Sequence, residues 1–280
     1  AIDTDQNGGV DLVYAGDMYG NLWKFNLSGS NTSSWGIPFS ASGKSAPLFK
    51  ASYGTARQPI TAKPQASRNP KGGVIVYFGT GQFFEVGDQA DKSEQTFYGV
   101  IDVCGLKTSG DCGKATGGAH VLRTDLLQQT ITVEKSAGFG EFTWDARLLS
   151  KNVIADTHKG FYLDLISPAK GKQGERVVST PLVWDDRVIF VTQIPDSDPC
   201  SYGGESWIME IDTKSGGQTS FPVFDMNADG NFDDGDKMVP PGLTVPPKPP
   251  NGRKVPGGLA KTPAVVSGAG GANKYTSGSS

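Results

Sequence analysis

The sequence predicts an all-β protein, a modified β-propeller in which two acidic loops with a glycine bend are inserted into the blades. Three observations predict this class. The chain of 280 residues has 38 glycines and 18 prolines but few runs that favour a helix. A pair of short apolar strands recurs along the chain, and an acidic loop adjoins strands at two places. Short strands repeated with glycine and aromatic residues between them are typical of propeller blades.

The first element is an acidic loop from Asp3 to Asp11, in which side chains carrying oxygen occupy positions 1, 3, 5 and 9 and glycine occupies position 6. Ca²⁺ takes about six to eight oxygen ligands, and a sharp turn brings alternate side chains to one point. We therefore predict a calcium site, with the apolar Val10 packed away from the ion. Position 12 is Tyr14, so a further ligand must come from elsewhere or be water. The predicted ligands are Asp3, Asp5, Asn7, Asp11 and the backbone carbonyl of Gly9.

A second loop, from Asp225 to Asp236, repeats this pattern and adds a carboxylate at position 12. Asp, Asn and Gly are also common turn residues, so an Asx-turn hairpin without metal is the alternative for each loop. Two matching loops in one chain favour the metal. Because the first loop lacks the carboxylate at position 12, we expect it to bind Ca²⁺ more weakly. The predicted ligands of the second loop are Asp225, Asn227, Asp229, Asn231, Asp233 and Asp236.

The predicted strands follow a repeating sequence pattern, in which an apolar strand precedes a strand that contains aromatic residues. Neither acidic loop has room for flanking helices, so the opening of a helix pair, as in EF-hand sensors, does not apply. The irregular spacing predicts three to five blades, some incomplete, with the rest of the propeller outside this chain. The predicted pairs are 12–17 with 20–27, 74–81 with 96–102, and 187–192 with 206–212. Proline-containing strands lead at 46–49, 179–183 and 261–266, and further strands are predicted at 130–134 and 160–165.

Two segments near the C-terminus are predicted to lie outside the sheets. The stretch 240–256 holds seven prolines, which lack the backbone N–H that a central strand needs, so we expect an exposed extended loop. The stretch 267–280 is rich in glycine and serine, and we expect it to be flexible or truncated.

Composition excludes several classes of function. The net charge is −3 without a basic stretch, which argues against nucleic acid and anionic membranes as partners. No apolar run approaches the ~18–20 residues of a membrane span. The spacing of Cys104 and Cys112 suits a disulfide across a hairpin and an oxidising compartment, whereas Cys200 has no evident partner. The isolated His120 and His158 provide neither a zinc site nor a base for a nucleophile, so we predict no enzyme.

The residues also carry a family resemblance. The acidic pattern of the first loop leads into Val13-Tyr14-Ala15-Gly16-Asp17 and then Gly20-Asn21-Leu22-Trp23-Lys24-Phe25. This run resembles the C-terminal domain of the PilC/PilY family of type IV pilus biogenesis and adhesion proteins. The resemblance spans nearly the whole chain in the family's order. Its other parts are 78–83, 95–102, 160–165 with 174–177, and 198–200 with 203–207.

The resemblance implies a modified propeller related to quinoprotein propellers, with bound Ca²⁺, at the pilus tip or outer surface of a bacterium. It implies that residues 1–280 are a fragment of the C-terminal propeller domain, without the family's large N-terminal region. The implied partners are pilins or minor pilins of a type IV pilus, together with a surface or host-cell ligand. The first loop would be the regulatory calcium site, and the second loop the further site that some members carry.

Two other classes of function compete with this interpretation. PQQ-dependent dehydrogenases are quinoprotein propellers with calcium, but they bind the ion through scattered side chains, and this chain lacks the vicinal cysteine pair that many of them have. Dockerin modules carry loops like the second one, but close together in sequence and each leading into a helix. Oxidation of an alcohol or sugar with added PQQ would favour the dehydrogenase. Substantial helix in the circular dichroism spectrum would favour the dockerin module.

Overall fold

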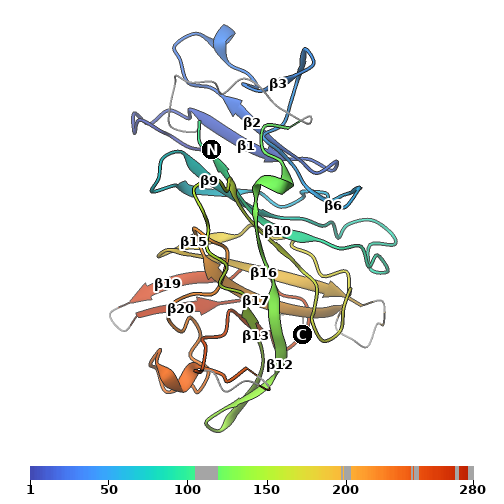
Figure 1. Ribbon diagram of the computed structural model, residues 1–280, viewed down its shortest axis with the longest axis vertical. Helices are drawn as coiled ribbons and strands as arrows, with labels where there is room; N and C mark the ends of the chain where they lie inside the picture. Colours follow the sequence, from blue (N-terminus) through green and yellow to red (C-terminus); the bar gives the residue numbers. More distant parts are fainter. Residues whose placement is uncertain are drawn as a thin grey trace.

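The computed structural model describes residues 1–104, 119–196, 198, 203–240, 242, 246–268 and 271–276. Within these ranges the regular structure is β-strand with short 3-10 turns, which confirms the all-β prediction. Three larger sheets follow one another along the longest axis of the molecule (Figure 1). No helix of the described part is long and apolar enough to cross a membrane.

The first sheet has the order β1-β2-β5 and follows the first acidic loop directly. The predicted strand pair is confirmed as an antiparallel hairpin. Its turn depends on Gly20, which has φ +78° and lies so close to neighbouring backbone that an added Cβ would stand 2.6 Å from the carbonyl oxygen of Gln58. The strands are β1 (Leu12–Gly16), β2 (Asn21–Asn26) and β5 (Phe49–Lys50).

The second sheet has five strands in the order β11-β14-β10-β9-β8. Every residue of β9 is buried, because both faces of this strand are covered by neighbouring sheets. Only β11 runs parallel to its neighbour, β14. The strands are β8 (Gln65–Arg68), β9 (Val74–Gly79), β10 (Thr96–Asp102), β11 (Leu127–Gln129) and β14 (Gly160–Asp164), so the strands predicted at 74–81, 96–102 and 160–165 are confirmed.

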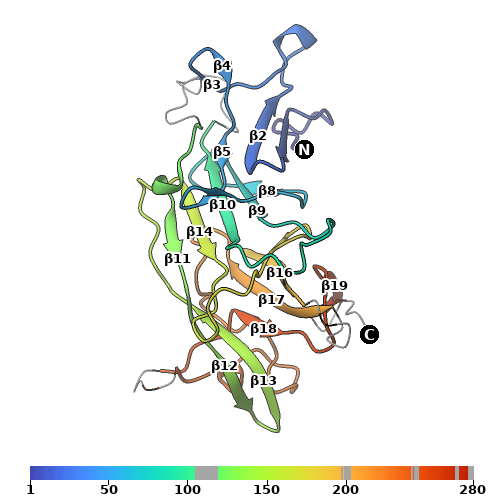
Figure 2. The ribbon, with the colours of Figure 1, turned by 90° about the vertical axis from the view of Figure 1, so that its right-hand side faces the viewer.

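The third sheet has six strands in the order β12-β13-β18-β17-β16-β15. Its strands β12 and β13 form a long hairpin that extends to the end of the molecule (Figure 2). The predicted pair at 187–192 and 206–212 is confirmed as β16 and β17. The strands are β12 (Ile131–Phe139), β13 (Phe142–Leu149), β15 (Leu182–Trp184), β16 (Arg187–Pro195), β17 (Gly204–Asp212) and β18 (Gly252–Lys254).

Strand β18 shows that the prediction of an exposed loop over 240–256 is wrong from residue 249 to 255, whereas Gly242 and residues 246–248 are exposed as expected. The segment places Gly252–Lys254 in the middle of the third sheet, paired with β13 and β17. Four consecutive residues, 251–254, contain no proline and can therefore donate to the sheet. The N–H of Asn251 donates to the carbonyl of Arg147, and the N–H of Glu210 donates to the carbonyl of Asn251, each at 2.8 Å. The neighbouring Pro249 and Pro250 are buried.

The C-terminal segment of the described part forms a hairpin rather than a loose tail. Strands β19 (Ala264–Gly268) and β20 (Gly271–Tyr275) pair antiparallel, which corrects the expectation of a flexible segment from 267 onward. Lys274 in β20 reaches the buried Glu210 of β17 and the carbonyl of Val223. Residues 277–280 lie outside the described ranges.

Three apolar clusters hold the sheets together. The first lies between the first and second sheets, where Phe49 and Tyr98 have ring centroids 5.0 Å apart. The second lies between the second and third sheets, where Phe97 and Phe190 stack at 3.8 Å. The third includes Met226 of the second acidic loop. Sheets that pack face to face in chain order are what the propeller prediction requires.

The cysteine prediction is met as far as the described residues extend. Cys104 is in a disulfide. Its predicted partner Cys112 lies outside the described residues, as does Cys200.

Candidate metal centre

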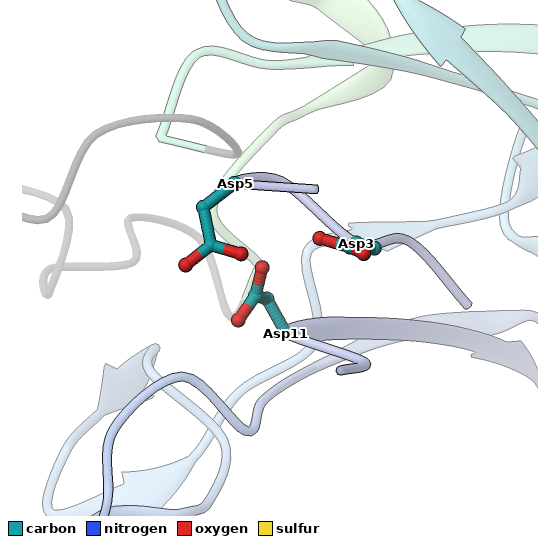
Figure 3. Close-up of side chains that lie close together, drawn as sticks. All are labelled: Asp3, Asp5 and Asp11. Atoms are coloured by element: carbon teal, nitrogen blue, oxygen red, sulfur yellow. The ribbon is translucent and has the colours of Figure 1, made fainter. Parts of the chain in front are cut away.

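The first loop gathers three carboxylates around one space. Ligand atoms of Asp3, Asp5 and Asp11 lie within 4.8 Å of one another, and no other group of three acidic, histidine or cysteine residues in the described part of the chain does so. Figure 3 shows the carboxylates of Asp5 and Asp11 facing each other, with Asp3 beside them. Asp5 is exposed, Asp3 half-buried and Asp11 buried. The donors are all hard oxygens, so the group fits Ca²⁺.

Backbone amides of the loop fix the direction of its side chains. Asp3 accepts hydrogen bonds from the N–H groups of Gln6 at 2.6 Å and Gly8 at 2.8 Å. Asn7 Oδ1 accepts from the N–H of Gly9 at 2.7 Å. Gln6 and Gly8 both have positive φ, at +62° and +88°, and so wind the backbone tightly around the carboxylates. The turn that the glycine at position 6 predicts is confirmed.

The second loop follows the same backbone path. Its positions 4 and 6, Ala228 and Gly230, also have positive φ, at +58° and +83°. The N–H of Gly230 donates to Asp225 Oδ2 at 3.0 Å, as Gly8 does to Asp3. Two segments far apart in sequence thus adopt one local conformation, because the same residue types stand at the same loop positions.

The two loops differ in the carboxylate that closes them. In the first loop Asp11, at position 9, accepts hydrogen bonds from Thr4 N–H at 2.7 Å and Thr4 Oγ1 at 2.6 Å. In the second loop Asp236, at position 12, accepts from the N–H of Met226 at 2.6 Å, the equivalent position 2. Asp11 therefore closes the first loop as the position-12 carboxylate closes the second, and the residue at position 12 of the first loop, Tyr14, lies in β1.

One oxygen of the second loop lacks a protein partner. Asp225 Oδ1 is buried and accepts no hydrogen bond, whereas Asp225 Oδ2 is bonded to Gly230. A buried carboxylate oxygen without a donor is costly unless a cation or water satisfies it. Asp229 and Asn231 are exposed at the rim. The residues of the second loop therefore also fit a cation, although its carboxylates are less closely gathered than those of the first loop.

Hydrogen bonds keep a predicted ligand carboxylate of each loop ionised. The Thr4 hydroxyl and amide hold the pKa of Asp11 below its usual value. The N–H of Asn231 and the side chain of Asn227 lower the pKa of Asp229 in the same way. Both groups therefore carry negative charge at neutral pH and are ready for a cation.

The prediction that Val10 packs into apolar surroundings is wrong. Val10 is 47% exposed, and Phe232, the residue at the same position of the second loop, is 51% exposed. Both loops project from the sheets here, so position 8 meets solvent instead of the apolar partner that a second helix would supply.

The first loop is connected to the second sheet through buried polar groups that the sequence did not indicate. Tyr14, three residues after Asp11, donates its hydroxyl hydrogen to Asp102 at 2.6 Å. Lys24 forms an ion pair with the same carboxylate at 2.6 Å, and both side chains are almost fully buried. Burial raises the pKa of Tyr14, so its hydroxyl stays protonated and remains a donor. The only sequence signal was a lysine inside an apolar strand.

Both histidines have structural roles. The ring of His120 stacks on Phe39 with centroids 4.3 Å apart, and His158 Nδ1 accepts the N–H of Ala155 at 2.9 Å. These contacts agree with the expectation that each histidine is a surface or structural residue. The absence of catalysis stays a prediction.

Comparisons with known proteins agree with the fold. A family model described as the PilY1 beta-propeller domain matches residues 1–142. A type IV pilus biogenesis factor PilY1 homolog of Xylella fastidiosa is 36% identical over 220 residues, and the type IV pilus biogenesis factor PilY1 of Pseudomonas aeruginosa strain UCBPP-PA14 is 34% identical over 266 residues. These matches cover 77% and 83% of this chain but only 14% and 22% of the relatives. The chain is therefore much shorter than the curated relatives.

A solved structure extends the likeness over nearly the whole chain. The crystal structure of the Pseudomonas aeruginosa PilY1 C-terminal domain matches with a TM-score of 0.81 and 27% sequence identity. The match covers 99% of this chain and 58% of that chain.

Proposed function

This chain belongs to the PilY1 family of type IV pilus proteins, and from that premise we propose that it is a calcium-binding part of a type IV pilus biogenesis factor. The curated relatives are named as such factors. The observation that carries the calcium proposal is the gathering of the carboxylates of Asp3, Asp5 and Asp11 around one space.

The proposed role of the cation is to order the loops. Three carboxylates within 4.8 Å repel one another, and a divalent cation removes that repulsion. In the first loop the ligands would be the side chains of Asp3, Asp5, Asn7 and Asp11 with the carbonyl of Gly9. In the second they would come from Asp225, Asn227, Asp229, Asn231, Asp233 and Asp236, and Asp225 Oδ1 supports a ligand role because it lacks another partner.

Order in the first loop would extend into the sheets. Asp11 leads directly into β1, and Tyr14 of that strand is hydrogen-bonded to Asp102 at the end of β10. Calcium occupancy would thereby fix the first sheet relative to the second. We propose that this edge of the protein contacts pilins or minor pilins, and that the intact parent protein acts at the pilus tip or outer surface, where it also contacts a surface or host-cell ligand.

Isothermal titration of the 280-residue chain with Ca²⁺ tests the metal sites. We expect two sites with Kd on the order of 10⁻⁴–10⁻³ M, the range of extracellular calcium modules. Asp5→Ala should remove the first site and Asp229→Ala the second, because both side chains are exposed and their loss does not disturb a core. Asp156→Ala, at an 88% exposed side chain outside both loops, is the matched control and should bind calcium like the unsubstituted chain. Calcium binding that is absent, or equal in all four proteins, would contradict the assignment.

A bacterial assay tests the pilus role separately. In the parent protein of this chain, Asp5→Ala and Asp229→Ala should reduce the number of surface pili or the attachment of cells, whereas Asp156→Ala should not. Normal piliation and attachment in a variant shown to have lost calcium would separate metal binding from the pilus function and overturn the proposed role of the cation.

A further inference from the structure

A pocket of about 550 Å³ opens at one end of the second sheet, and no residue of either acidic loop lines it. One wall is the turn between β8 and β9, with Asn69 to Gly72, and the other is the loop before β14, with Ile154 to His158. The volume is in the range of sites that hold small organic molecules.

The lining of the pocket is largely apolar. Its apolar lining comes from Ile75 of β9, Ile101 of β10, Val103 and Ile154. Ile75 is only 2% exposed and belongs to the core between the second and third sheets, whereas Val103 is 51% exposed. The pocket is therefore an opening of the core toward solvent, and an apolar molecule that covers Val103 would remove apolar surface from water.

The polar groups of the pocket are mostly hydrogen-bond donors. His158 Nδ1 accepts the N–H of Ala155 at 2.9 Å, so the neutral ring carries its hydrogen on Nε2 and offers it as a donor. Lys214 is exposed and lines the same pocket, and no residue within the described ranges forms an ion pair with it. Lys71 and Asp156 pair with each other across the two walls, so their charges cancel. The charge left over is the positive charge of Lys214.

The two walls are held in place by other parts of the fold. Gly73 has φ +83° and lies so close to β10 that an added Cβ would stand 2.3 Å from the carbonyl oxygen of Asp102. The opposite loop is anchored by the buried Gln129, which donates to the carbonyl of Asn152 at 2.9 Å and accepts its N–H at 3.1 Å. By contrast, the Lys71–Asp156 pair is exposed and contributes little, so it can part when a molecule enters.

From this arrangement we propose that the pocket binds an aliphatic carboxylate, with its hydrocarbon part on Ile75, Ile101 and Ile154 and its carboxylate held by Lys214 and His158. An unbranched chain of about eight to ten carbons suits a volume of this size. The same chemistry is offered by a free fatty acid and by a peptide that ends in an aliphatic residue. The proposal does not depend on the calcium loops.

The test is titration of the 280-residue chain with sodium decanoate below its micelle concentration, in parallel with decanol and with a pentapeptide that ends in leucine. We expect saturable binding of decanoate at a single site, and about tenfold weaker binding of decanol, because a charged hydrogen bond is lost. Binding of the peptide alone would assign the carboxylate to a protein C-terminus, and binding of decanoate alone to a fatty acid. Both results support the shared chemistry.

Two variants locate the site. Lys214→Gln should weaken decanoate binding about tenfold and leave decanol binding unchanged, because only the charge is removed. Ile154→Trp should block all three probes by filling the pocket. Lys44→Gln, at an exposed lysine of β4 (Lys44–Ser45) in the first part of the chain, is the matched control. Calcium titration and melting temperature verify the fold of each variant. Absence of binding to all probes, or decanoate binding in Lys214→Gln and Ile154→Trp as tight as in the unsubstituted chain, would overturn the proposal.

Discussion

Asp102 joins the first two sheets through two buried polar contacts. It holds the ammonium of Lys24 and the hydroxyl of Tyr14, all in a buried environment. Two charges removed from water are tolerated when they compensate each other, and the loss of one leaves the other uncompensated. This buried ion pair adds a polar connection to the apolar cluster that packs the first sheet on the second.

We predict that Asp102→Asn lowers the free energy of unfolding by about 3–5 kcal/mol, the usual cost of breaking a buried pair from one side. Chemical denaturation measures this value. The matched control is Asp156→Asn, which breaks the exposed pair with Lys71 and should cost less than about 1 kcal/mol. In addition, Lys24→Met in the Asp102→Asn background should recover part of the loss. Equal effects of the two single substitutions would show that the Lys24–Asp102 pair is not buried as described.

Asp17 gives the turn between β1 and β2 a dependence on pH. Burial raises the pKa of this carboxyl, but hydrogen bonds from Asn21 and Trp23 outweigh burial, and the pKa is lowered overall. A carboxyl with a lower pKa in the folded state stabilises the fold above its unfolded pKa of about 4 and loses this effect as pH falls through the folded value.

We therefore predict that the difference in unfolding free energy between the unsubstituted chain and Asp17→Asn is constant from pH 7 to about pH 5 and shrinks below about pH 4. Urea denaturation across this range measures it. A difference that stays constant down to pH 2 would mean that Asp17 is not a charged acceptor in the turn.

At the scale of elements, the second loop depends on a carboxylate even without metal. Asp236 is fully buried and accepts the N–H groups of Met226, Asn227 and Asp233. By contrast, Asp229 is exposed and bonded only to its neighbours in the loop. Asp236 thus has a structural role in the loop besides its proposed role as a ligand, whereas Asp229 has only the proposed ligand role.

We predict that Asp236→Ala lowers the free energy of unfolding by about 2–4 kcal/mol in EDTA, because buried N–H groups lose a charged acceptor. Asp229→Ala should change it by less than about 1 kcal/mol in EDTA and should lower stability only when calcium is present. Denaturation in EDTA and in calcium distinguishes the two. If Asp229→Ala were as harmful in EDTA as Asp236→Ala, the separation of roles would be wrong.

At the scale of the whole molecule, the proposed calcium sites predict a coupling between metal binding and the stability of the fold. Both loops are attached to sheets that pack in series, so metal bound at either loop stabilises the folded state against the unfolded chain. A ligand that binds only the folded state adds RT ln(1 + [L]/Kd). With Kd on the order of 10⁻⁴–10⁻³ M, 10 mM Ca²⁺ should add about 1.4–2.7 kcal/mol for each site.

The melting temperature should therefore rise by several degrees between EDTA and 10 mM Ca²⁺, at about 2–4 °C for each kcal/mol in a chain of this size. The rise should be about halved in Asp5→Ala, and Mg²⁺ at the same concentration should have a smaller effect, because its strict octahedral geometry suits such loops less well. Differential scanning calorimetry measures these shifts. If calcium did not raise the melting temperature of the unsubstituted chain, the proposal of two stabilising sites would be wrong. It would also be wrong if calcium raised the melting temperature of the double variant Asp5→Ala, Asp229→Ala by the full amount.

The sequence by itself determined the features that depend on neighbouring residues. The paired strands, the turn of Gly20 and the conformation shared by the two acidic loops were predictable, because strand period and turn chemistry act over a few residues. The same local rules identified the carboxylates of the candidate site from the order of the residues alone.

Only the tertiary structure decided which distant segments meet. It placed Gly252–Lys254 inside a sheet despite the surrounding prolines, left Val10 exposed, and joined Lys24 to Asp102. It also gave Asp11 the closing role that Asp236 has in the second loop. These outcomes depend on burial and on partners far away in the chain. A local pattern cannot specify them, because the free energy of a buried polar group is set by whatever the complete fold brings beside it.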